Sequence, residues 1–226
     1  MKNMLLFSIV LLAALSSNAN VLGNMQTLAP NPDSLFFQNA HSSKTLAKNY
    51  FNVGLFLAYV RNELSAYDNI TLAKPEYLKY KDQATTFDFV AAWGVTNHFE
   101  VFYAMPVFLE QRPDSGQVDN KYISKGANVH RPGIKYDISQ NSSGGFAVVA
   151  SVDFPVTVDD PYVGTSPSPI YNIEFVRDFR RKEDAFGINL GYRHRNPGQI
   201  PANNAYFYPL KSQVIGSLAY MYGMQK

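Results

Sequence analysis

Hydrophobic and polar residues alternate through residues 85–111, on both sides of a short polar break. Before the break, Phe87 and Trp93 belong to the same apolar phase, and mostly small or polar residues lie between the members of that phase. The alternation resumes at Phe99, after the break at residues 96–98. A period of two is typical of a β-strand, and two such runs joined by a tight turn predict a β-hairpin.

The same alternation recurs in eight segments of the chain. These segments are 50–60, 84–95, 98–110, 127–138, 145–156, 169–179, 185–195 and 208–222. Each is close to the ~10 residues that a tilted strand needs to cross a bilayer, whereas strands of soluble proteins usually have about 5 or 6 residues. The pattern therefore predicts an all-β chain of about eight strands, each long enough to span a membrane.

The joins between these segments alternate between long and short. The long joins are 61–83, 111–126, 157–168 and 196–207, and the short joins are 96–97, 139–144 and 180–184. Outer-membrane barrels have short periplasmic turns and long extracellular loops, so an up-and-down barrel must show this rhythm. The rhythm favours an antiparallel up-and-down transmembrane β-barrel with both ends in the periplasm. The alternative is a soluble periplasmic or secreted β-barrel that binds an apolar ligand.

The two phases of the strands differ in chemistry. Bulky apolar residues fill one phase, and we expect its aromatic members, with those at the strand ends, to face lipid or the membrane interface. These aromatics are Phe51, Tyr59, Phe87, Phe89, Trp93, Phe99, Tyr103, Tyr136, Phe146, Phe154, Tyr171, Phe175, Phe186, Tyr192, Tyr220 and Tyr222. The interior of an eight-stranded barrel is just wide enough for side chains, so bulky aromatics suit the lipid side.

The opposite phase combines glycine and alanine with charges that we expect to line the lumen. The charges are Asp88, Glu100, Arg131, Lys135, Asp137, Asp153, Glu174, Asp178 and Arg193. An unpaired buried charge is costly, so these residues are expected to neutralise one another rather than to line an ion path. The register of the hairpin across residues 139–144 predicts an ion pair between Arg131 and Asp153.

The N-terminus has the form of a secretory signal peptide. Lys2 precedes an unbroken apolar run at residues 4–15, and residues 17–19 fit the small-x-small cleavage pattern. The run is too short to span a membrane as a helix. The predicted organisation is 1–19 signal peptide, 20–49 N-terminal linker or plug, 50–222 β-barrel and 223–226 tail, in the outer membrane of a Gram-negative cell.

Composition excludes some classes of function. The formal net charge is +2, which excludes a strongly basic nucleic-acid binder. The chain has no cysteine, which excludes a disulfide scaffold and a lipoprotein anchor. HExxH, GxSxG and phosphate-loop motifs are absent, so we expect no catalytic residue, no metal and no cofactor.

Two histidines keep a weaker alternative open. His130 and His194 lie near the long-join ends of their predicted strands. Two histidines fall short of the ligand set of a metal site. Some small outer-membrane barrels are lipid-modifying enzymes that use histidine near the rim, and such an enzyme is the third hypothesis.

Residues 93–109 resemble the periplasmic hairpin in the barrel portion of OmpA-like outer-membrane proteins. The matching residues are Gly94-Val95-Thr96, Phe99-Glu100-Val101 and Met105-Pro106. The likeness covers roughly residues 50–222 in pattern, although only this hairpin matches in specific residues. It implies a mainly structural, anchoring barrel, with weak pore formation or surface contact as secondary activities. Outer-membrane lipids, lipopolysaccharide and the barrel-assembly machinery are the implied partners, and no surface partner is specified.

Two departures from the OmpA-like pattern concern the C-terminal end. Many relatives carry a peptidoglycan-binding domain after the barrel, and none follows in this sequence. Outer-membrane barrels tend to end on an aromatic residue, whereas Tyr222 is followed by residues 223–226. Two expectations stay open: an assembly signal slightly inside the chain, or a truncated version of a larger barrel.

Overall fold

The computed structural model describes residues 30–33, 35, 37, 40–61, 83–112, 125–157, 168–181, 184–196 and 211–222. The predicted signal peptide, the tail at 223–226 and most of the long joins lie outside these residues. Every regular element in the described part is a β-strand. None of the described residues belongs to a helix long and apolar enough to cross a membrane.

The strands follow the predicted segments closely, and the antiparallel all-β fold is confirmed. They are β1 (Phe51–Arg61), β2 (Gln83–Gly94), β3 (Phe99–Arg112), β4 (Gly126–Ala127), β5 (Val129–Asn141), β6 (Gly144–Pro155), β7 (Ile170–Arg181), β8 (Asp184–His194) and β9 (Gln213–Met221). The last strand begins later than the predicted residue 208. Ser212 explains part of this difference, because its hydroxyl accepts a 3.1 Å hydrogen bond from the Arg195 amide and so belongs to the loop.

The strands form one meander in which consecutive long strands pair side by side. The order is β1-β2-β3-β5-β6-β7-β8-β9, and the short β4 adds to β3 at Val107 and Phe108. The strand ends that flank residues 95–98, 142–143 and 182–183 lie at one end of the sheet, and the strand ends that flank the predicted long joins lie at the other. The predicted rhythm of the connections is therefore present in the structure.

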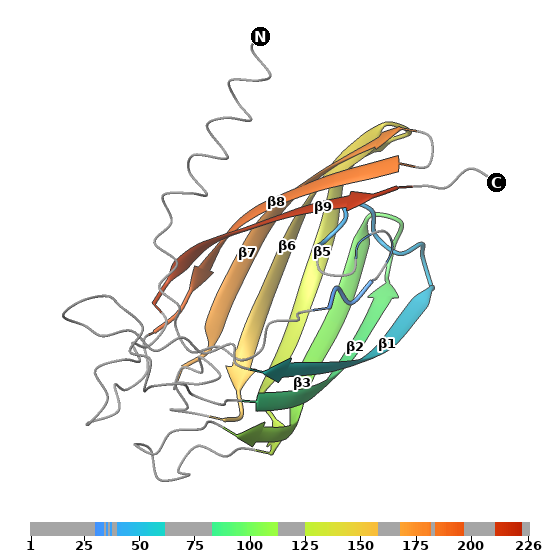
Figure 1. The fold of residues 1–226 in the computed structure, drawn as a ribbon. Coiled ribbons are helices and arrows are strands. Elements are labelled where there is room, and N and C mark those ends of the chain that lie inside the picture. Colours follow the sequence, from blue (N-terminus) through green and yellow to red (C-terminus); the bar gives the residue numbers. More distant parts are fainter. Residues whose placement is uncertain are drawn as a thin grey trace.

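The sheet curls into a trough, with β1 and β9 as its two edges (Figure 1). In the described residues β1 pairs only with β2, and β9 pairs only with β8. The fold is thus an antiparallel sheet with the curl of a barrel, open along one seam. Closure into a full ring stays a prediction.

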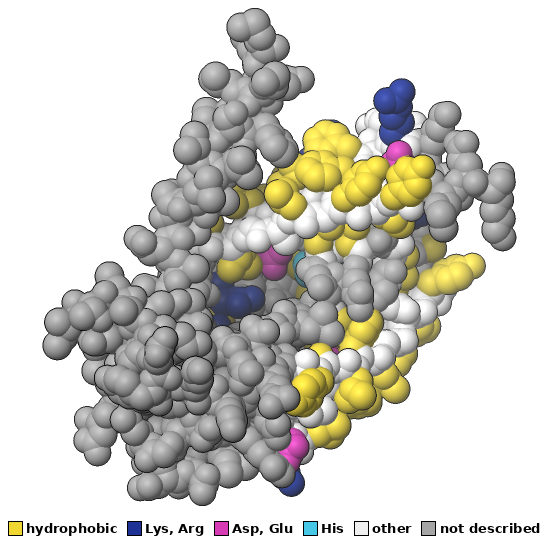
Figure 2. Space-filling model, in the orientation of Figure 1, with side chains coloured by type: hydrophobic (Ala, Val, Ile, Leu, Met, Phe, Trp, Pro, Cys, Tyr) yellow, Lys and Arg dark blue, Asp and Glu magenta, His cyan; other side chains and the backbone are white. Residues whose placement is uncertain are grey.

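Apolar side chains lie on the convex side of the sheet, where they are solvent-exposed. Phe51 is 71 % exposed, Leu57 70 % and Val214 75 %, whereas Lys135 and Asp178 on the concave side are fully buried. Figure 2 shows hydrophobic side chains along the outer side of the strands and charged side chains inside the hollow. This distribution is the inverse of a water-soluble β-barrel, whose apolar side chains fill the interior.

All sixteen aromatics predicted to face outward lie on the convex side or at the strand ends. The exposed ones are Phe51, Tyr59, Trp93, Tyr136, Phe154, Tyr171, Phe175, Tyr192, Tyr220 and Tyr222. The half-buried ones are Phe87, Phe89, Phe99, Tyr103, Phe146 and Phe186. Neighbouring rings contact each other across strands, as Phe51 does with Trp93 at 5.6 Å between centroids.

The trough is filled by the chain that precedes β1. We call the described residues between 30 and 50 the plug segment (Figure 1). Leu46 packs with Phe102, Ala92 and Val149 of the concave face, and Phe37 and Ala40 pack with Ala185. Burial of these apolar side chains stabilises the segment inside the trough by about 1–2 kcal/mol each. The core of the fold therefore lies between the plug segment and the sheet.

Candidate functional site

Lys135 stands at the centre of a buried polar network between the plug segment and the sheet. Its ammonium group contacts the carboxylate of Asp33 in the plug segment and lies 3.5 Å from Oε1 of Glu100 on β3. The three side chains are at most 1 % exposed. Glu100 and Lys135 are direct partners in the register of β3 and β5, so the sheet itself brings this pair together. Asp33 reaches the pair only because the plug segment enters the trough.

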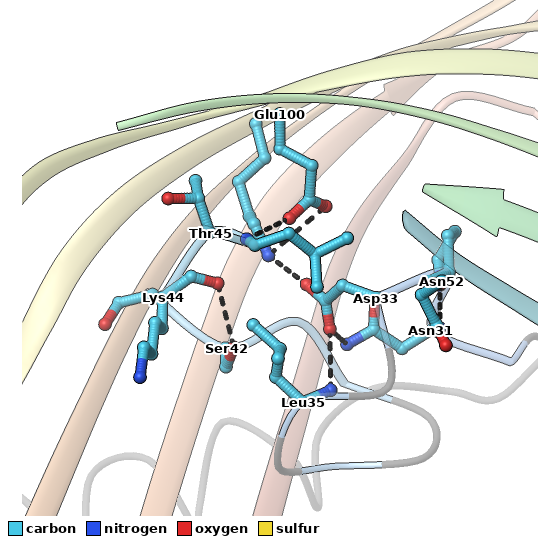
Figure 3. A network of polar contacts seen from close by, with 12 residues as sticks. Asn31, Asp33, Leu35, Ser42, Lys44, Thr45, Asn52 and Glu100 are labelled. Atoms are coloured by element: carbon cyan, nitrogen blue, oxygen red, sulfur yellow. Dashed lines mark hydrogen bonds and ion pairs between the residues drawn. The ribbon is translucent and has the colours of Figure 1, made fainter. Parts of the chain in front are cut away.

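The two carboxylates are also bound by donors of the plug segment (Figure 3). Glu100 Oε2 accepts a 2.7 Å hydrogen bond from the Leu46 amide. Asp33 Oδ1 accepts hydrogen bonds from Asn31 Nδ2 at 2.9 Å and from the Leu35 amide at 3.0 Å. Buried charges are tolerated when an opposite charge and additional hydrogen bonds satisfy them, and both conditions hold here.

A third buried carboxylate, that of Asp178, fixes the plug segment beside the short turns. Asp178 on β7 accepts hydrogen bonds from the hydroxyl of Ser43 and from its amide at 3.3 Å. The Gly145 amide donates to the same carboxylate at 2.9 Å, and Arg180 Nη2 lies 2.8 Å away. A carboxylate that receives this many donors is held rigidly, so the plug segment is attached to β6 and β7 as well as to β3 and β5.

The end of the plug segment is tied to the turn between β2 and β3. Thr45 Oγ1 donates to the Asn97 carbonyl at 2.9 Å, and the Lys48 amide donates to Asn97 Oδ1 at 3.1 Å. Asn49 has a φ of 68°, a left-handed conformation that asparagine tolerates better than most residues, and its amide donates to Gly94 O at 2.7 Å. This turn leads the chain out of the trough and into β1.

Two glycines of the concave face leave the space that the plug segment occupies. A Cβ atom at Gly94 would overlap the backbone carbonyl oxygens of Leu46 and Ala47. A Cβ atom at Gly187 would lie 2.6 Å from the ring of Phe37. Glycine at these positions therefore allows the close approach of the plug segment to the sheet.

In the half of the lumen near the long joins, the charges pair with one another. Arg131 binds Asp153 through two contacts, Nε–Oδ1 at 2.5 Å and Nη2–Oδ2 at 2.9 Å, as the hairpin register predicted. Asn172 joins this group, because its Oδ1 accepts a 2.6 Å hydrogen bond from Arg193 Nε and its Nδ2 lies 3.4 Å from Asp153 Oδ1. Asp153 is thereby matched by a two-point guanidinium contact, the strongest ion-pair geometry.

A polar cavity of about 180 Å³ remains in this half of the lumen. Its walls include Arg131, Glu174 and Arg193 of the sheet, residues 30–32 of the plug segment, and residues 215–217 of β9. The cavity is bounded by the plug segment on one side and by the concave sides of β3 and β5 to β9 on the other. Its lining is mixed in charge.

His41 of the plug segment also lines this cavity, and its backbone is bound by Asn189. The amide group of Asn189 lies 2.8 Å from His41 N and 3.1 Å from His41 O. Burial, with a smaller contribution from the Lys135 charge, lowers the pKa of His41 from 6.5 to about 4. The ring is therefore neutral at pH 7, and its protonation would place another positive charge beside Lys135.

All nine predicted lumen charges lie on the concave side of the sheet. Six are buried and three, Arg131, Glu174 and Arg193, are half-buried. Asp137 lies at the rim, where the exposed His98 ring approaches to 3.3 Å. Sequence reasoning did not identify Asp33, Ser43 or Leu46 as partners of these charges. No periodic pattern marks residues 30–49, so only their position in space revealed the contacts.

The two rim histidines each have a partner of their own. The Tyr103 hydroxyl contacts His130, and the Ser212 hydroxyl lies 3.3 Å from His194 Nδ1. Ser212 also donates to the Arg195 carbonyl at 3.3 Å, so its hydroxyl is shared. Among the described residues, no three His, Asp or Glu side chains are grouped as metal ligands.

No protein-family model, no curated protein and no solved structure matches the chain. The class of the protein therefore follows from its own fold and lumen. It is an antiparallel sheet with the curl of a barrel, apolar on its convex side, with a plug segment fixed by buried charges on its concave side.

Proposed function

We propose that the protein is an outer-membrane β-barrel with a mainly structural, anchoring role, and that its lumen is closed by its own N-terminal plug segment. The inverse distribution of side chains is the observation that carries this proposal. Outward residues such as Phe51, Leu57 and Val214 are 70 % exposed or more, while charges such as Lys135 are fully buried. Acyl chains are the environment in which such a surface is favourable.

The energies involved support a lipid environment. Moving a fully exposed large apolar side chain out of water is worth about 1.5–3 kcal/mol, so a half-exposed one is worth about 1 kcal/mol. Every long strand carries at least one exposed large apolar side chain on the convex side, and on β2 this residue is Trp93. The total is on the order of tens of kcal/mol, whereas the net stability of a domain is about 5–15 kcal/mol. Water would therefore favour aggregation of this surface.

The plug segment favours a structural, anchoring role for the protein over a role as a channel for ions or solutes. Glu100, Lys135 and Asp178 bind residues of the plug segment, so they are engaged in holding the chain. An ion path would need exposed charges along an open channel. Outer-membrane lipids, lipopolysaccharide and the assembly machinery belong to this proposal as partners, and weak pore formation requires movement of the plug segment.

The single tryptophan offers a direct test. Trp93 is 38 % exposed on the convex side, at the end of β2 beside a short turn. In vesicles of phosphatidylcholine with brominated acyl chains, its fluorescence should be quenched. Bromine near the headgroup should quench more than bromine near the bilayer centre, because the short turns lie at the membrane interface. Iodide added to the water should have little effect.

A matched control places the same fluorophore on the concave side. In the double variant Trp93→Phe, Phe102→Trp, the indole replaces a buried ring that borders the cavity. Brominated lipid should leave its emission unchanged. If Trp93 resists brominated lipid, and the chain remains a dispersed monomer in buffer without detergent, the soluble alternative replaces this proposal.

A further inference from the structure

The ion pairs near the long joins leave one arginine without a partner. Arg195 directly follows the last residue of β8 and is 6 % exposed. Its Nε and Nη1 atoms are buried, and neither has a hydrogen-bond partner among the described residues. A buried donor without an acceptor is costly, because it has lost its bonds to water and gained nothing in return. The guanidinium group of Arg195 therefore calls for an oxygen acceptor.

Arg195 lies on the concave side of the sheet, next to Arg193. The concave residues of β8 have odd numbers, and Arg195 continues this phase one step nearer the long joins. Arg193 lines the cavity, and the register of the sheet places it in one row with Asn172 of β7 and Ser151 of β6. The backbone of Arg195 is fixed by the Ser212 hydroxyl, at 3.1 Å from its amide. The two arginines are therefore held as neighbours at the long-join end of the cavity.

The carboxylates of this region do not satisfy the two arginines. Asp153 is engaged by the two-point contact with Arg131, and Arg193 Nε donates to the uncharged Asn172. In the described part of the chain, neither Arg193 nor Arg195 forms an ion pair with a carboxylate. Burial and the positive charge of Arg193 lower the pKa of Arg195 to about 10, and Asp153 offsets only part of this. Arg195 stays protonated at pH 7, with its charge poorly compensated.

The local balance of charge is also positive. Glu174 is the other carboxylate that faces Arg193, and it lines the same cavity. Three arginines, Arg131, Arg193 and Arg195, thus stand against two carboxylates, Asp153 and Glu174. One positive charge remains, and a single bound anion would balance it.

The chemistry of the cavity suits an oxyanion. A guanidinium group presents its donors in a planar fork that matches the oxygens of a carboxylate or a phosphate. The hydroxyls of Ser151 and Ser217 line the same cavity and can donate to further oxygens of a ligand. A volume of about 180 Å³ has room for a group of this size together with ordered water.

We propose that Arg193 and Arg195 bind a small oxyanion, a phosphate or carboxylate group, in the cavity at the long-join end of the lumen. Residues 30–32 and His41 of the plug segment form the opposite wall, so the bound anion contacts the plug segment as well as the sheet. This binding site goes beyond the proposed anchoring role. It also does not depend on whether the convex side of the sheet faces lipid.

Calorimetric titration of the folded protein in micelles of an uncharged detergent tests the site, with inorganic phosphate and acetate as separate probes. Sodium chloride keeps the ionic strength constant, so general screening is the same throughout. We expect saturable binding of at least one of the two anions. Arg195→Gln should weaken it about tenfold or more, because a hydrogen bond between charged groups is lost, and Arg193→Gln should act similarly. Arg181→Gln is the matched control, because Arg181 is exposed at the short-turn end of β7, and its affinity should be unchanged.

The outcomes separate the possible explanations. Binding of phosphate alone assigns a phosphate group to the site, and binding of acetate alone assigns a carboxylate. Absence of saturable binding with both probes would overturn the inference, as would an affinity that is unchanged in Arg195→Gln and Arg193→Gln. An equal loss in Arg181→Gln would reduce the effect to attraction by net charge, and would overturn it too.

Two further measurements keep the test decisive. Unheated gels show which variants fold, and if one arginine variant does not fold, the other decides. Quenching of Trp93 by brominated lipid is a separate readout, so a failure of anion binding leaves the membrane proposal standing, and a failure of quenching leaves the anion site standing.

Discussion

Near the short turns the buried charges of the sheet bind the plug segment, whereas near the long joins the charges bind one another. Lys135 and Asp178 represent the first region, and both contact residues that precede β1. Arg131 and Asp153 represent the second, and their hairpin alone brings them together. The first region holds a separate segment of chain in place, while the second leaves a cavity of about 180 Å³.

The ion pairs of the two regions differ in how much stability is lost when one partner is removed. Lys135 has no access to solvent, so its two carboxylate partners compensate for a large desolvation cost. The Arg131 side chain is 20 % exposed and borders the cavity, so water can solvate it when its partner is lost. We therefore expect the region near the short turns to be the more sensitive to substitution.

The largest effect is expected for Lys135→Met. The substitution leaves the carboxylates of Asp33 and Glu100 buried without their cation, and breaking a buried ion pair in this way costs about 3–5 kcal/mol. Urea unfolding in lipid vesicles, followed by the shift between folded and unfolded bands on unheated gels, measures the loss. Lys44→Met is the control, because Lys44 is exposed, and it should change stability by less than about 0.5 kcal/mol. Equal effects of the two variants would contradict the buried network.

A smaller effect is expected when the plug segment is pushed away from the sheet. In Gly94→Ala the new Cβ atom overlaps the carbonyl oxygens of Leu46 and Ala47, and overpacking of this kind costs about 1–3 kcal/mol. At Gly216 an added Cβ atom would meet only Asn189 O at 3.6 Å, an ordinary contact. Gly216→Ala should therefore be near neutral. Protease sensitivity of the plug segment in vesicles should rise in the first variant alone.

Asp153→Ala tests the other half of the lumen. It removes the partner of Arg131, and we expect a loss of about 1–2 kcal/mol, because the guanidinium borders a polar cavity and can be hydrated. The midpoint of thermal unfolding is the measurement. An unchanged midpoint would mean that the ion pair contributes nothing. A loss as large as that of Lys135→Met would mean that the two regions do not differ as proposed.

The smallest expected effect is a loss of stability at acidic pH that depends on His41. Its pKa is lowered from 6.5 to about 4 in the folded state, so between these pH values the unfolded chain binds more protons than the folded one. The contribution of His41 to stability is complete above pH 6.5 and is lost as the pH decreases toward 4. The full shift would be worth about 3 kcal/mol, and the partial solvent contact of the ring reduces the loss below that figure. The slope of stability against pH should be smaller in His41→Phe. Identical slopes would show that His41 is not the titrating group.

The strands, their number and the chemistry of their two sides could be predicted from the sequence because these features are local. Alternation with a period of two assigns Phe87 and Trp93 to one side and Asp88 to the other, and a short turn sets the register of each hairpin. The Arg131–Asp153 pair follows from that register alone. Boundaries shifted, as at β9, which begins at Gln213, and the two-residue strand β4 beside β3 was not predicted as a separate strand.

The contacts of the plug segment were decided by the tertiary structure. Asp33 and Lys135 are 102 residues apart, and the segment around Asp33 has neither alternation nor a turn register that would place it. The open seam between β1 and β9 has the same origin, because the width of a curled sheet depends on what it encloses. Patterns within a strand specify which side a residue faces, whereas the partner it meets there depends on the packing of the whole chain.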